Sequence, residues 1–184
     1  ILVTGANKGI GLATVENLLQ NHPDTFLILG SRDEQRGDEA LGLLTSKEPK
    51  WSDRLMMLAI DVSSDESVTL AAETLDSSFE TEAKPLYGII NNAGIGSSSI
   101  GLEPTLQVNT WGIHRVCEAF IPLLEASGRI VNVTSAAGPN FVEAADDVTR
   151  TMLTDPDVQW DAVEEYMNRC ISESKDSAST SSGL

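Results

Sequence analysis

The chain alternates short apolar runs with longer segments whose apolar residues recur every three or four positions. A strand covered on both faces forms a continuous apolar run, whereas an amphipathic helix has a period near 3.6, so the alternation predicts repeated strand–helix–strand units. We expect strands near residues 1–4, 26–30, 55–60, 86–91 and 129–134. The expected helices between them cover residues 9–20, 33–46, 65–80 and 104–125. The predicted fold class is α/β, with a doubly wound parallel sheet.

The alternation stops near residue 140, so we divide the chain into a nucleotide-binding core (1–140), a helical insertion (141–173) and a flexible Ser-rich segment (174–184). Residues 142–171 predict two acidic amphipathic helices interrupted at Asp155-Pro156. From residue 172 onward the chain has too few apolar residues to offset the entropy of ordering, which predicts a loop. Residue 1 already belongs to the first expected strand, so we expect that the N-terminus has been trimmed.

Composition argues against several classes of partner. The formal net charge of −16 disfavours nucleic acid, because phosphate binding needs clustered Lys and Arg. The chain has neither a long apolar run nor a secretory signal, so we expect no membrane partner and a cytoplasmic location. Cys117 and Cys170 fit neither a metal-ligand spacing nor a disulfide framework, and no metal site is expected.

A glycine-rich turn, Thr4-Gly5-Ala6-Asn7-Lys8-Gly9-Ile10-Gly11, separates the first expected strand from the first expected helix. Gly5 permits a sharp turn, Gly9 lets the backbone approach a ligand, and Gly11 lets the helix pack closely on the sheet. The helix N-terminus then directs its unpaired N–H groups at an anion. A plain strand–helix turn is the alternative, because the spacing differs from the common G-x-G-x-x-G. The context favours a phosphate site.

Four further motifs follow the turn in a fixed order: Asp61-Val62, Asn91-Asn92-Ala93-Gly94, Asn109 and Ser135. Together these elements of residues 1–140 resemble the signature of the short-chain dehydrogenase/reductases, which have a Rossmann-type sheet. The resemblance implies a nicotinamide dinucleotide cofactor and hydride transfer. The implied cofactor-binding residues are Gly5, Asn7, Lys8, Gly9, Ile10, Gly11, Arg32, Asp61, Val62, Asn91, Ala93 and Gly94.

The residue after the second strand predicts which dinucleotide binds. An acidic residue there holds a ribose 2′-hydroxyl, whereas an Arg accommodates a 2′-phosphate. The strand ends at Arg32, which favours NADP, and the resemblance gives Lys8 the same role. The alternative is that Arg32 is a surface residue at the start of a helix, next to Asp33.

The resemblance also assigns the adenine and ribose contacts. It implies that Asp61 accepts a hydrogen bond from the adenine amine and that the Val62 N–H contacts the ring. Asp61 could also cap the following helix, and the two roles are compatible. It implies that residues 91–94 border the ribose through backbone atoms and brace the sheet through a side chain. An ordinary turn is the alternative for that motif.

On the substrate side, the resemblance gives Ser135 the hydrogen bond to the reacting oxygen and Asn109 the anchoring of a water relay. A serine in a small-residue loop is the alternative for Ser135. An amide within a helix competes for backbone hydrogen bonds, so Asn109 is an unusual choice without a function. His114 receives no role from the resemblance, and we expect a packed or surface histidine.

The proton-donating motif of the family, Tyr-x-x-x-Lys, is missing from the sequence. Tyr87 is followed four residues later by Asn91, and Tyr166 by Cys170, so neither fits. Either the protein is a natural pseudoenzyme or the sequence ends before the motif, and we favour the second interpretation. The insertion, with Trp160 and Tyr166, resembles that of the monomeric carbonyl reductases, which implies a monomer.

These observations predict that the full-length protein reduces small-molecule carbonyl substrates, namely ketones, aldehydes or quinones, to alcohols with NADPH. The alternative is a non-catalytic NADP-binding sensor or interaction module. It would keep the glycine turn and Arg32 but show no turnover.

Overall fold

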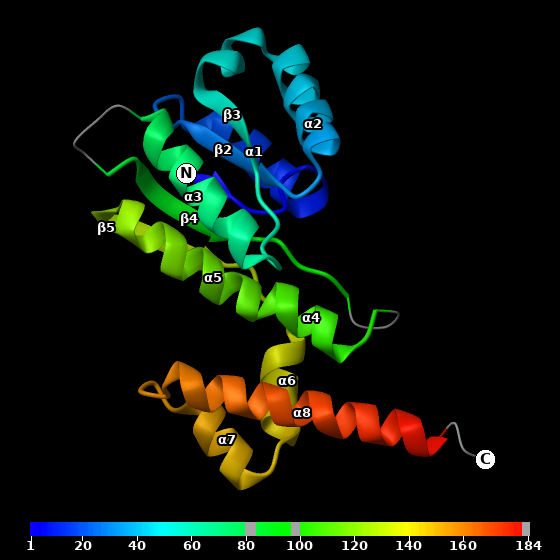
Figure 1. Ribbon diagram of the computed structural model, residues 1–184. Helices are drawn as coiled ribbons and strands as arrows, with labels where there is room; N and C mark the ends of the chain where they lie inside the picture. Colours follow the sequence, from blue (N-terminus) through cyan, green and yellow to red (C-terminus); the bar gives the residue numbers. More distant parts are fainter. Residues whose placement is uncertain (80–83, 97–99, 182–184) are drawn as a thin grey trace.

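The computed structural model describes residues 1–79, 84–96 and 100–181 (Figure 1). Within them, parallel strands form one sheet in the order β3-β2-β1-β4-β5. The strands are β1 (Leu2–Val3), β2 (Leu27–Ser31), β3 (Leu55–Ala59), β4 (Leu86–Asn91) and β5 (Leu124–Asn132). The order reverses its direction between β1 and β4, which is where open α/β sheets bind ligands. The predicted doubly wound α/β fold is confirmed.

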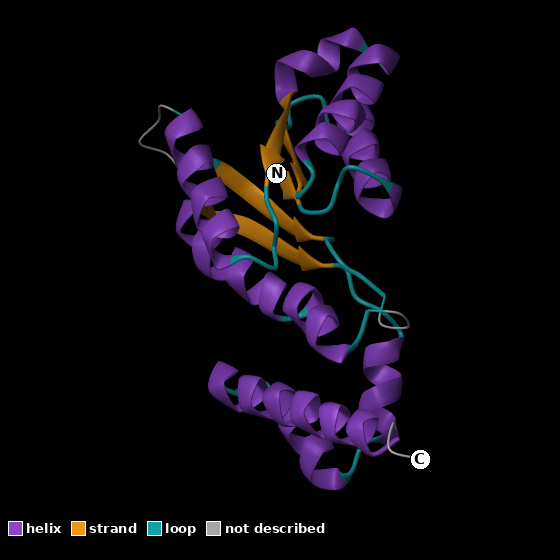
Figure 2. Cartoon of the chain, turned by 45° about the vertical axis from the view of Figure 1, so that its right-hand side comes forward, coloured by secondary structure: helices purple, strands orange, loops and turns teal. Residues whose placement is uncertain are grey.

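Helices cover both faces of this sheet (Figure 2). One face carries α1 (Gly9–Asn21) and α2 (Glu34–Lys47), and the 3₁₀ helix η1 (Pro49–Arg54) leads into β3. The other carries α3 (Asp65–Ser78) and α5 (Trp111–Phe120), with α4 (Leu102–Asn109) just before α5.

Strand residues alternate between two buried clusters because successive side chains point to opposite faces of a sheet. Leu2 and Ile28 pack with Phe120 in the cluster beneath α3 and α5. Val3 and Leu29, their neighbours in sequence, pack in the cluster beneath α1 and α2. The central strands are therefore buried on both faces, as their apolar runs predict.

The single helix expected over residues 104–125 is wrong. The chain breaks at Thr110, whose backbone angles (φ −126°, ψ −63°) are not helical, and α5 ends at Phe120. Pro122, in the 3₁₀ helix η2 (Ile121–Leu123), has no N–H to continue the helical hydrogen bonds. Strand β5 consequently begins at Leu124, earlier than the expected residue 129, and ends at Asn132 rather than at 134.

The helical segment after the core also differs from the prediction. It begins at residue 137 rather than 141, and its helices are α6 (Ala137–Ala144), α7 (Asp147–Thr154) and α8 (Trp160–Ser181). The chain therefore has one more break than predicted, between α6 and α7. At this break Asp146 caps α7 by accepting a hydrogen bond from the Thr149 N–H at 2.9 Å. The predicted interruption at Asp155-Pro156 is confirmed.

The loop predicted from residue 172, including the flexible segment 174–184, is wrong as far as Ser181 because α8 continues. The Ser172 hydroxyl donates to the Asn168 carbonyl at 3.1 Å, so its hydrogen bond is made within the helix. Residues 182–184 lie outside the described parts.

Helix α8 lies along α4 and α5, as both ribbon views show (Figures 1 and 2). Trp111 packs in a buried cluster with Met167 and Ile171, and its indole N–H donates to Glu164 Oε1 at 2.8 Å. None of the described helices is long and apolar enough to cross a membrane. The cytoplasmic location stays a prediction.

Candidate nucleotide-binding site

A pocket with a volume of about 370 Å³ opens where β1, β2, β3 and β4 end. This is the carboxyl edge at which a doubly wound sheet binds its ligands. The pocket contains every residue predicted to bind cofactor except Gly11 and Asn91. It also contains Asn92, which the sequence analysis named only as part of the 91–94 motif, and Ile60, Ile95 and Val108, which it did not select. Its full lining is Gly5, Asn7, Lys8, Gly9, Ile10, Arg32, Ile60, Asp61, Val62, Asn92, Ala93, Gly94, Ile95 and Val108.

The glycines of the turn have distinct steric roles. Gly5 and Gly9 adopt left-handed backbone angles (φ +63° and +58°), which favour glycine. A Cβ on Gly5 would lie 2.8 Å from Ala93 Cα, whereas the space around Gly9 is open. Gly11 is buried, and a Cβ there would lie 2.4 Å from Asn92 Nδ2. Gly11 therefore permits close packing, as predicted, but does not line the pocket.

Thr4 and Asn92 join the two loops that face each other across the sheet edge. The Thr4 hydroxyl oxygen accepts from the N–H groups of Asn92 and Ala93, both at 3.1 Å. The Asn92 amide donates back to the carbonyls of Thr4 (2.9 Å) and Gly5 (3.2 Å). The sequence analysis did not predict these hydrogen bonds, because Thr4 and Asn92 are nearly ninety residues apart. The local signals for them are a Thr before the glycine turn and an Asn after a strand.

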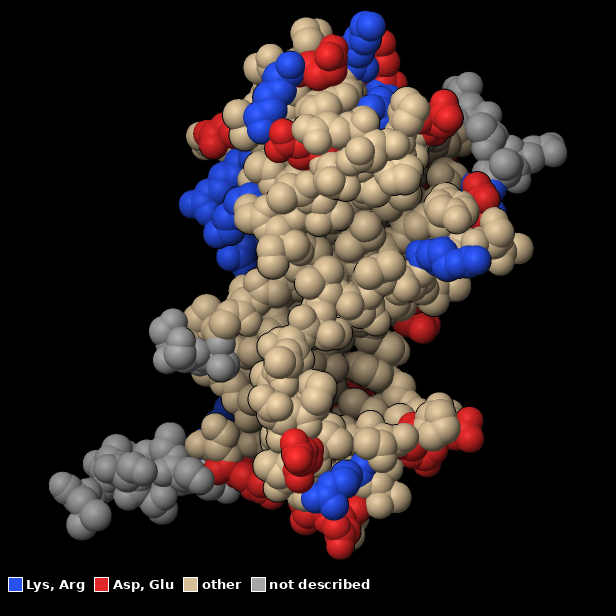
Figure 3. Space-filling model, turned by 180° about the vertical axis from the view of Figure 1, so that it is seen from behind, with Lys and Arg blue, Asp and Glu red and all other residues tan. Residues whose placement is uncertain are grey.

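Two cations at the pocket, Arg32 and Lys8, are exposed and have no ion-pair or hydrogen-bond partner within the described residues. The Asp33 carboxylate does not pair with Arg32. Instead it accepts from the Arg36 N–H at 3.0 Å and lies 3.3 Å from Arg36 Nε. Figure 3 shows Lys and Arg side chains mainly over the core, whereas acidic ones dominate the helical segment. Both cations are therefore available to an anion.

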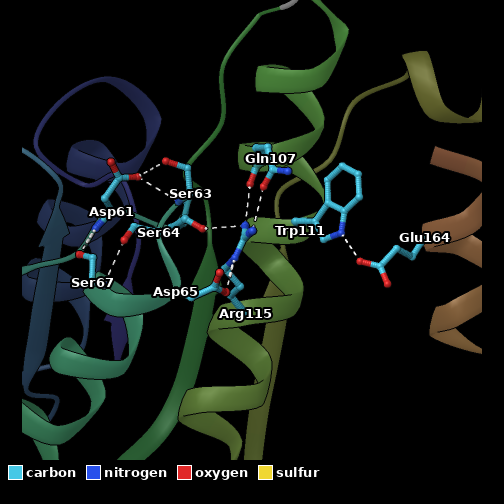
Figure 4. Close-up of polar contacts among 10 residues, drawn as sticks. Asp61, Ser63, Ser64, Asp65, Ser67, Gln107, Trp111, Arg115 and Glu164 are labelled. Carbon is cyan, nitrogen blue, oxygen red and sulfur yellow. Dashed lines mark hydrogen bonds and ion pairs between the residues drawn. The ribbon is translucent and has the colours of Figure 1, made fainter. Parts of the chain in front are cut away.

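Asp61 lines the pocket, and Figure 4 shows its contacts with Ser63. Its Oδ1 accepts from the Ser63 N–H at 2.9 Å and the Ser63 hydroxyl at 2.6 Å. Ser64, not Asp61, caps α3 by accepting from the Ser67 N–H, so the capping role considered for Asp61 is wrong. Asp61 Oδ2 has no partner in the described chain and can accept from a ligand amine.

Asn91 is buried below the pocket and does not line it. Its Nδ2 donates to Asn132 Oδ1 at 2.9 Å, which braces β4 against β5. Its Oδ1 has no hydrogen-bond partner among the described residues. The bracing role matches the one that the resemblance implies, whereas direct side-chain contact with a cofactor in the pocket does not follow from this geometry.

The two predicted catalytic residues lie outside the pocket lining. Asn109 ends α4 and binds the backbone of Ile95, which does line the pocket. Ser135 is exposed between β5 and α6, and its hydroxyl oxygen accepts from the Ala137 N–H at 3.2 Å. Their catalytic roles stay predictions.

Neither tyrosine is positioned to donate a proton at this pocket. Tyr87 is 51% exposed and stands near the start of β4, at the opposite end of the strand. Tyr166 belongs to α8, where burial and its hydrogen bond with Cys170 raise the pKa of the phenol. His114 stacks on Trp160 with ring centroids 3.8 Å apart, which confirms the expectation of a packed histidine.

Comparisons with known proteins support the family that the motifs predict. The chain is 35% identical over 147 residues to the mitochondrial D-beta-hydroxybutyrate dehydrogenase of Bos taurus, with 75% of this chain and 41% of the relative covered. It is 31% identical over 204 residues to the (+)-neomenthol dehydrogenase of Arabidopsis thaliana, with 95% and 66% covered. It is 27% identical over 183 residues to carbonyl reductase [NADPH] 1 of Rattus norvegicus, with 95% and 62% covered. The chain thus spans about two fifths to two thirds of these relatives.

Solved structures show the same fold. Menthone neomenthol reductase from Mentha piperita superposes with a TM-score of 0.79 at 24% identity, covering 96% of this chain and 74% of that one. NADPH-bound carbonyl reductase from chicken fatty liver has a TM-score of 0.62 at 31% identity, with 74% and 59% covered. The family model described as short chain dehydrogenase matches residues 1–145. Because this model matches more than half of the chain, the chain belongs to the short-chain dehydrogenase family.

Proposed function

We propose that the protein containing this chain reduces small-molecule carbonyl compounds with NADPH. The observation that carries the proposal is the pair of unpartnered cations, Arg32 and Lys8, at a pocket that also contains the glycine turn. The relatives named neomenthol dehydrogenase and carbonyl reductase [NADPH] 1 support it, because each match covers 95% of the chain. A match over 95% of the chain must include most of α6, α7 and α8. The match to D-beta-hydroxybutyrate dehydrogenase covers 75% of the chain and can leave these helices out.

The pocket residues fit NADP. The first turn of α1 has unpaired N–H groups, and Lys8 before it makes no side-chain cap, so the backbone can bind the two linking phosphates. The Arg32 guanidinium is a planar donor suited to the 2′-phosphate. Asp61 Oδ2 can accept from the adenine amine, while Val62 and Val108 offer apolar walls to the ring. When bound, the cofactor supplies the hydride.

In the proposed reaction, Ser135 orients the substrate oxygen. Asn109 positions the loop that contains Ile95, whose backbone it binds. A hydroxyl suits this role because it can donate to an oxygen that gains negative charge during reduction. The proposal requires a proton donor from outside this chain, because neither Tyr87 nor Tyr166 lies at the pocket.

Steady-state NADPH oxidation by the complete protein, measured with aldehydes, ketones and quinones, tests this function. We expect carbonyl-dependent turnover that falls by about a hundredfold or more in Ser135→Ala, since a lost oxyanion donor typically costs that much. The affinity for NADPH should not change in this variant. NADPH binding without turnover on any carbonyl would instead support the non-catalytic sensor or interaction module.

We also propose that the protein is a monomer. Helix α8 covers α5 through a buried cluster of Trp111, Met167 and Ile171 and through the stacked rings of His114 and Trp160. This packing supports the monomer that the resemblance to the monomeric carbonyl reductases implies. Sedimentation of the complete protein at micromolar concentration should give a single monomeric species. A dimer of the wild-type protein under these conditions would contradict this proposal.

A further inference from the structure

Arg115 of α5 contacts two separate parts of the chain (Figure 4). Its Nε lies 2.6 Å from Asp65 Oδ1, and its Nη1 donates at the long distance of 3.5 Å to the Val62 carbonyl. On the other side, Nη1 donates to the Gln107 carbonyl at 3.2 Å and Nη2 to Gln107 Oε1 at 2.8 Å. One guanidinium thus connects the loop after β3 with the end of α4.

These two parts of the chain both contribute to the lining of the nucleotide pocket. Val62 belongs to the loop after β3 and lines the pocket, and Val108, the residue after Gln107, lines it from α4. Arg115 itself lines neither this pocket nor the neighbouring one that Ser63 and Gln107 border. The guanidinium therefore connects two parts of the pocket lining without lining the pocket itself.

Gly112 supplies an independent contact between α5 and the same lining. A Cβ at Gly112 would lie 3.0 Å from Val62 Cγ2 and 3.1 Å from the Val62 carbonyl oxygen, which is closer than ordinary van der Waals contact. Arg115 follows Gly112 by three residues, so both lie on one face of the helix. The backbone of α5 and the guanidinium together hold Val62 in place.

We propose that Arg115 is a positioning residue for the adenine end of the pocket, acting through Val62 and Gln107 without touching the nucleotide. The proposal rests on the proposed function only in requiring that the pocket binds an adenine dinucleotide. It predicts a specific loss of affinity for adenine nucleotides when Arg115 is replaced, with little change in the chemical step.

The ion pair with Asp65 does not account for this role. The Asp65 side chain is 84% exposed, and exposed ion pairs contribute little to stability, whereas the Arg115 side chain is only 16% exposed. A lysine can pair with Asp65 but cannot connect both parts of the lining, because its charge is compact and its donors do not form a planar fork. Arg115→Lys should therefore recover only part of the function.

Calorimetric titration of the complete protein with ADP and with NADPH tests the proposal. We expect Arg115→Met to weaken the binding of both by about tenfold, because the displaced lining loses about 1.4 kcal/mol of contact with the nucleotide, and Arg115→Lys to weaken it by about threefold. In steady state the KM for NADPH should rise in Arg115→Met while kcat changes by less than about twofold, since the lining contacts the adenine end of the cofactor equally in ground and transition states.

Arg54→Met is the matched control. Arg54 also donates to backbone carbonyls, those of His22 (3.0 Å) and Thr25 (3.1 Å), but at the amino ends of β2 and β3, away from the pocket. The Arg54→Met variant should lower the melting temperature about as much as Arg115→Met does, and it should leave the affinity for ADP unchanged. If both variants weaken ADP binding alike, Arg115 contributes only general stability and the proposal is overturned.

Gly112→Ala provides a second variant in case Arg115→Met does not fold. Its methyl group presses on Val62 alone, so ADP binding should weaken while the protein remains folded. ADP binding within about twofold of wild type in the folded variants would overturn the proposal without affecting the proposed function. A wild-type protein that binds neither ADP nor NADPH would overturn both.

Discussion

Asn109 holds Ile95 through two hydrogen bonds: its Nδ2 donates to the Ile95 carbonyl and its Oδ1 accepts from the Ile95 N–H, each at 2.9 Å. Asn109 is the last residue of α4, and Ile95 lines the nucleotide pocket in the loop after β4. One amide side chain, used as donor and acceptor, thus fixes the position of a pocket wall.

Asn109→Asp should destabilise the protein because a carboxylate cannot donate to the Ile95 carbonyl. At pH 7 we expect the free energy of unfolding to fall by about 1–3 kcal/mol, the cost of leaving a partly buried acceptor unpaired. Chemical denaturation measures this change. Asn168→Asp, which adds the same charge at an exposed position on α8, is the control. Equal stabilities of the two variants would show that the bonds to Ile95 contribute nothing.

Gly5→Ala should weaken nucleotide binding and stability together, because the left-handed backbone and the 2.8 Å approach to Ala93 Cα both exclude a methyl group. We expect a loss of about 2 kcal/mol or more in unfolding free energy, from strain and overpacking combined. Gly42→Ala, in the open interior of α2, should instead raise it by about 0.5–1 kcal/mol. Thermal denaturation of both variants checks the contrast, and a Gly5→Ala protein as stable as wild type would refute the steric argument.

Asp146 should make the stability of α7 depend on pH. Hydrogen bonds from the Thr149 N–H and hydroxyl lower the pKa of this exposed carboxyl below its ordinary value. The ionised carboxylate therefore stabilises the folded state above the ordinary pKa, and this contribution disappears as the pH falls through the lowered value. Asp146→Ala should lower the melting temperature at pH 7 but not at pH 2. Asp146→Asn, which still caps but carries no charge, should lower the melting temperature at pH 7 by less than Asp146→Ala does, and should match the wild type at pH 2. A loss in Asp146→Ala that persists in acid would contradict this assignment.

Trp111→Phe should loosen the contact of α8 with α5, because phenylalanine keeps most of the packing but cannot donate to Glu164. A double-mutant cycle with Glu164→Gln should give a coupling energy of about 1 kcal/mol, in the range of a side-chain hydrogen bond. Additive effects of the two substitutions would show that this hydrogen bond does not hold the helical segment.

The glycine turn and the strand ends could be predicted because local patterns determine them. An apolar run ended by a polar residue identifies both the strand and its ligand-facing end, so Gly5, Arg32 and Asp61 were found without the structure. The face of the sheet to which each strand residue points can then be predicted, because successive side chains point to opposite faces.

Contacts distant in sequence could not be predicted in this way. The hydrogen bonds between Thr4 and Asn92, and those of Arg115 to Val62 and Gln107, depend on how loops meet across the sheet. The end of α5 was missed although Pro122 signalled it locally, because the apolar spacing on either side continued. The extension of α8 through its serine-rich end to Ser181 was also missed, because composition predicted a loop there.

The relative affinity for NADPH and NADH, measured by calorimetry on the complete protein, tests the central claim most directly. We predict that NADPH binds at least about tenfold more tightly, the equivalent of one additional charged contact, and that Arg32→Ala abolishes this preference. Arg36→Ala, which removes an exposed cation that pairs with Asp33 and does not line the pocket, should retain it. Equal affinities of the wild-type protein for the two cofactors would contradict the assignment of Arg32 and the NADPH dependence proposed from it.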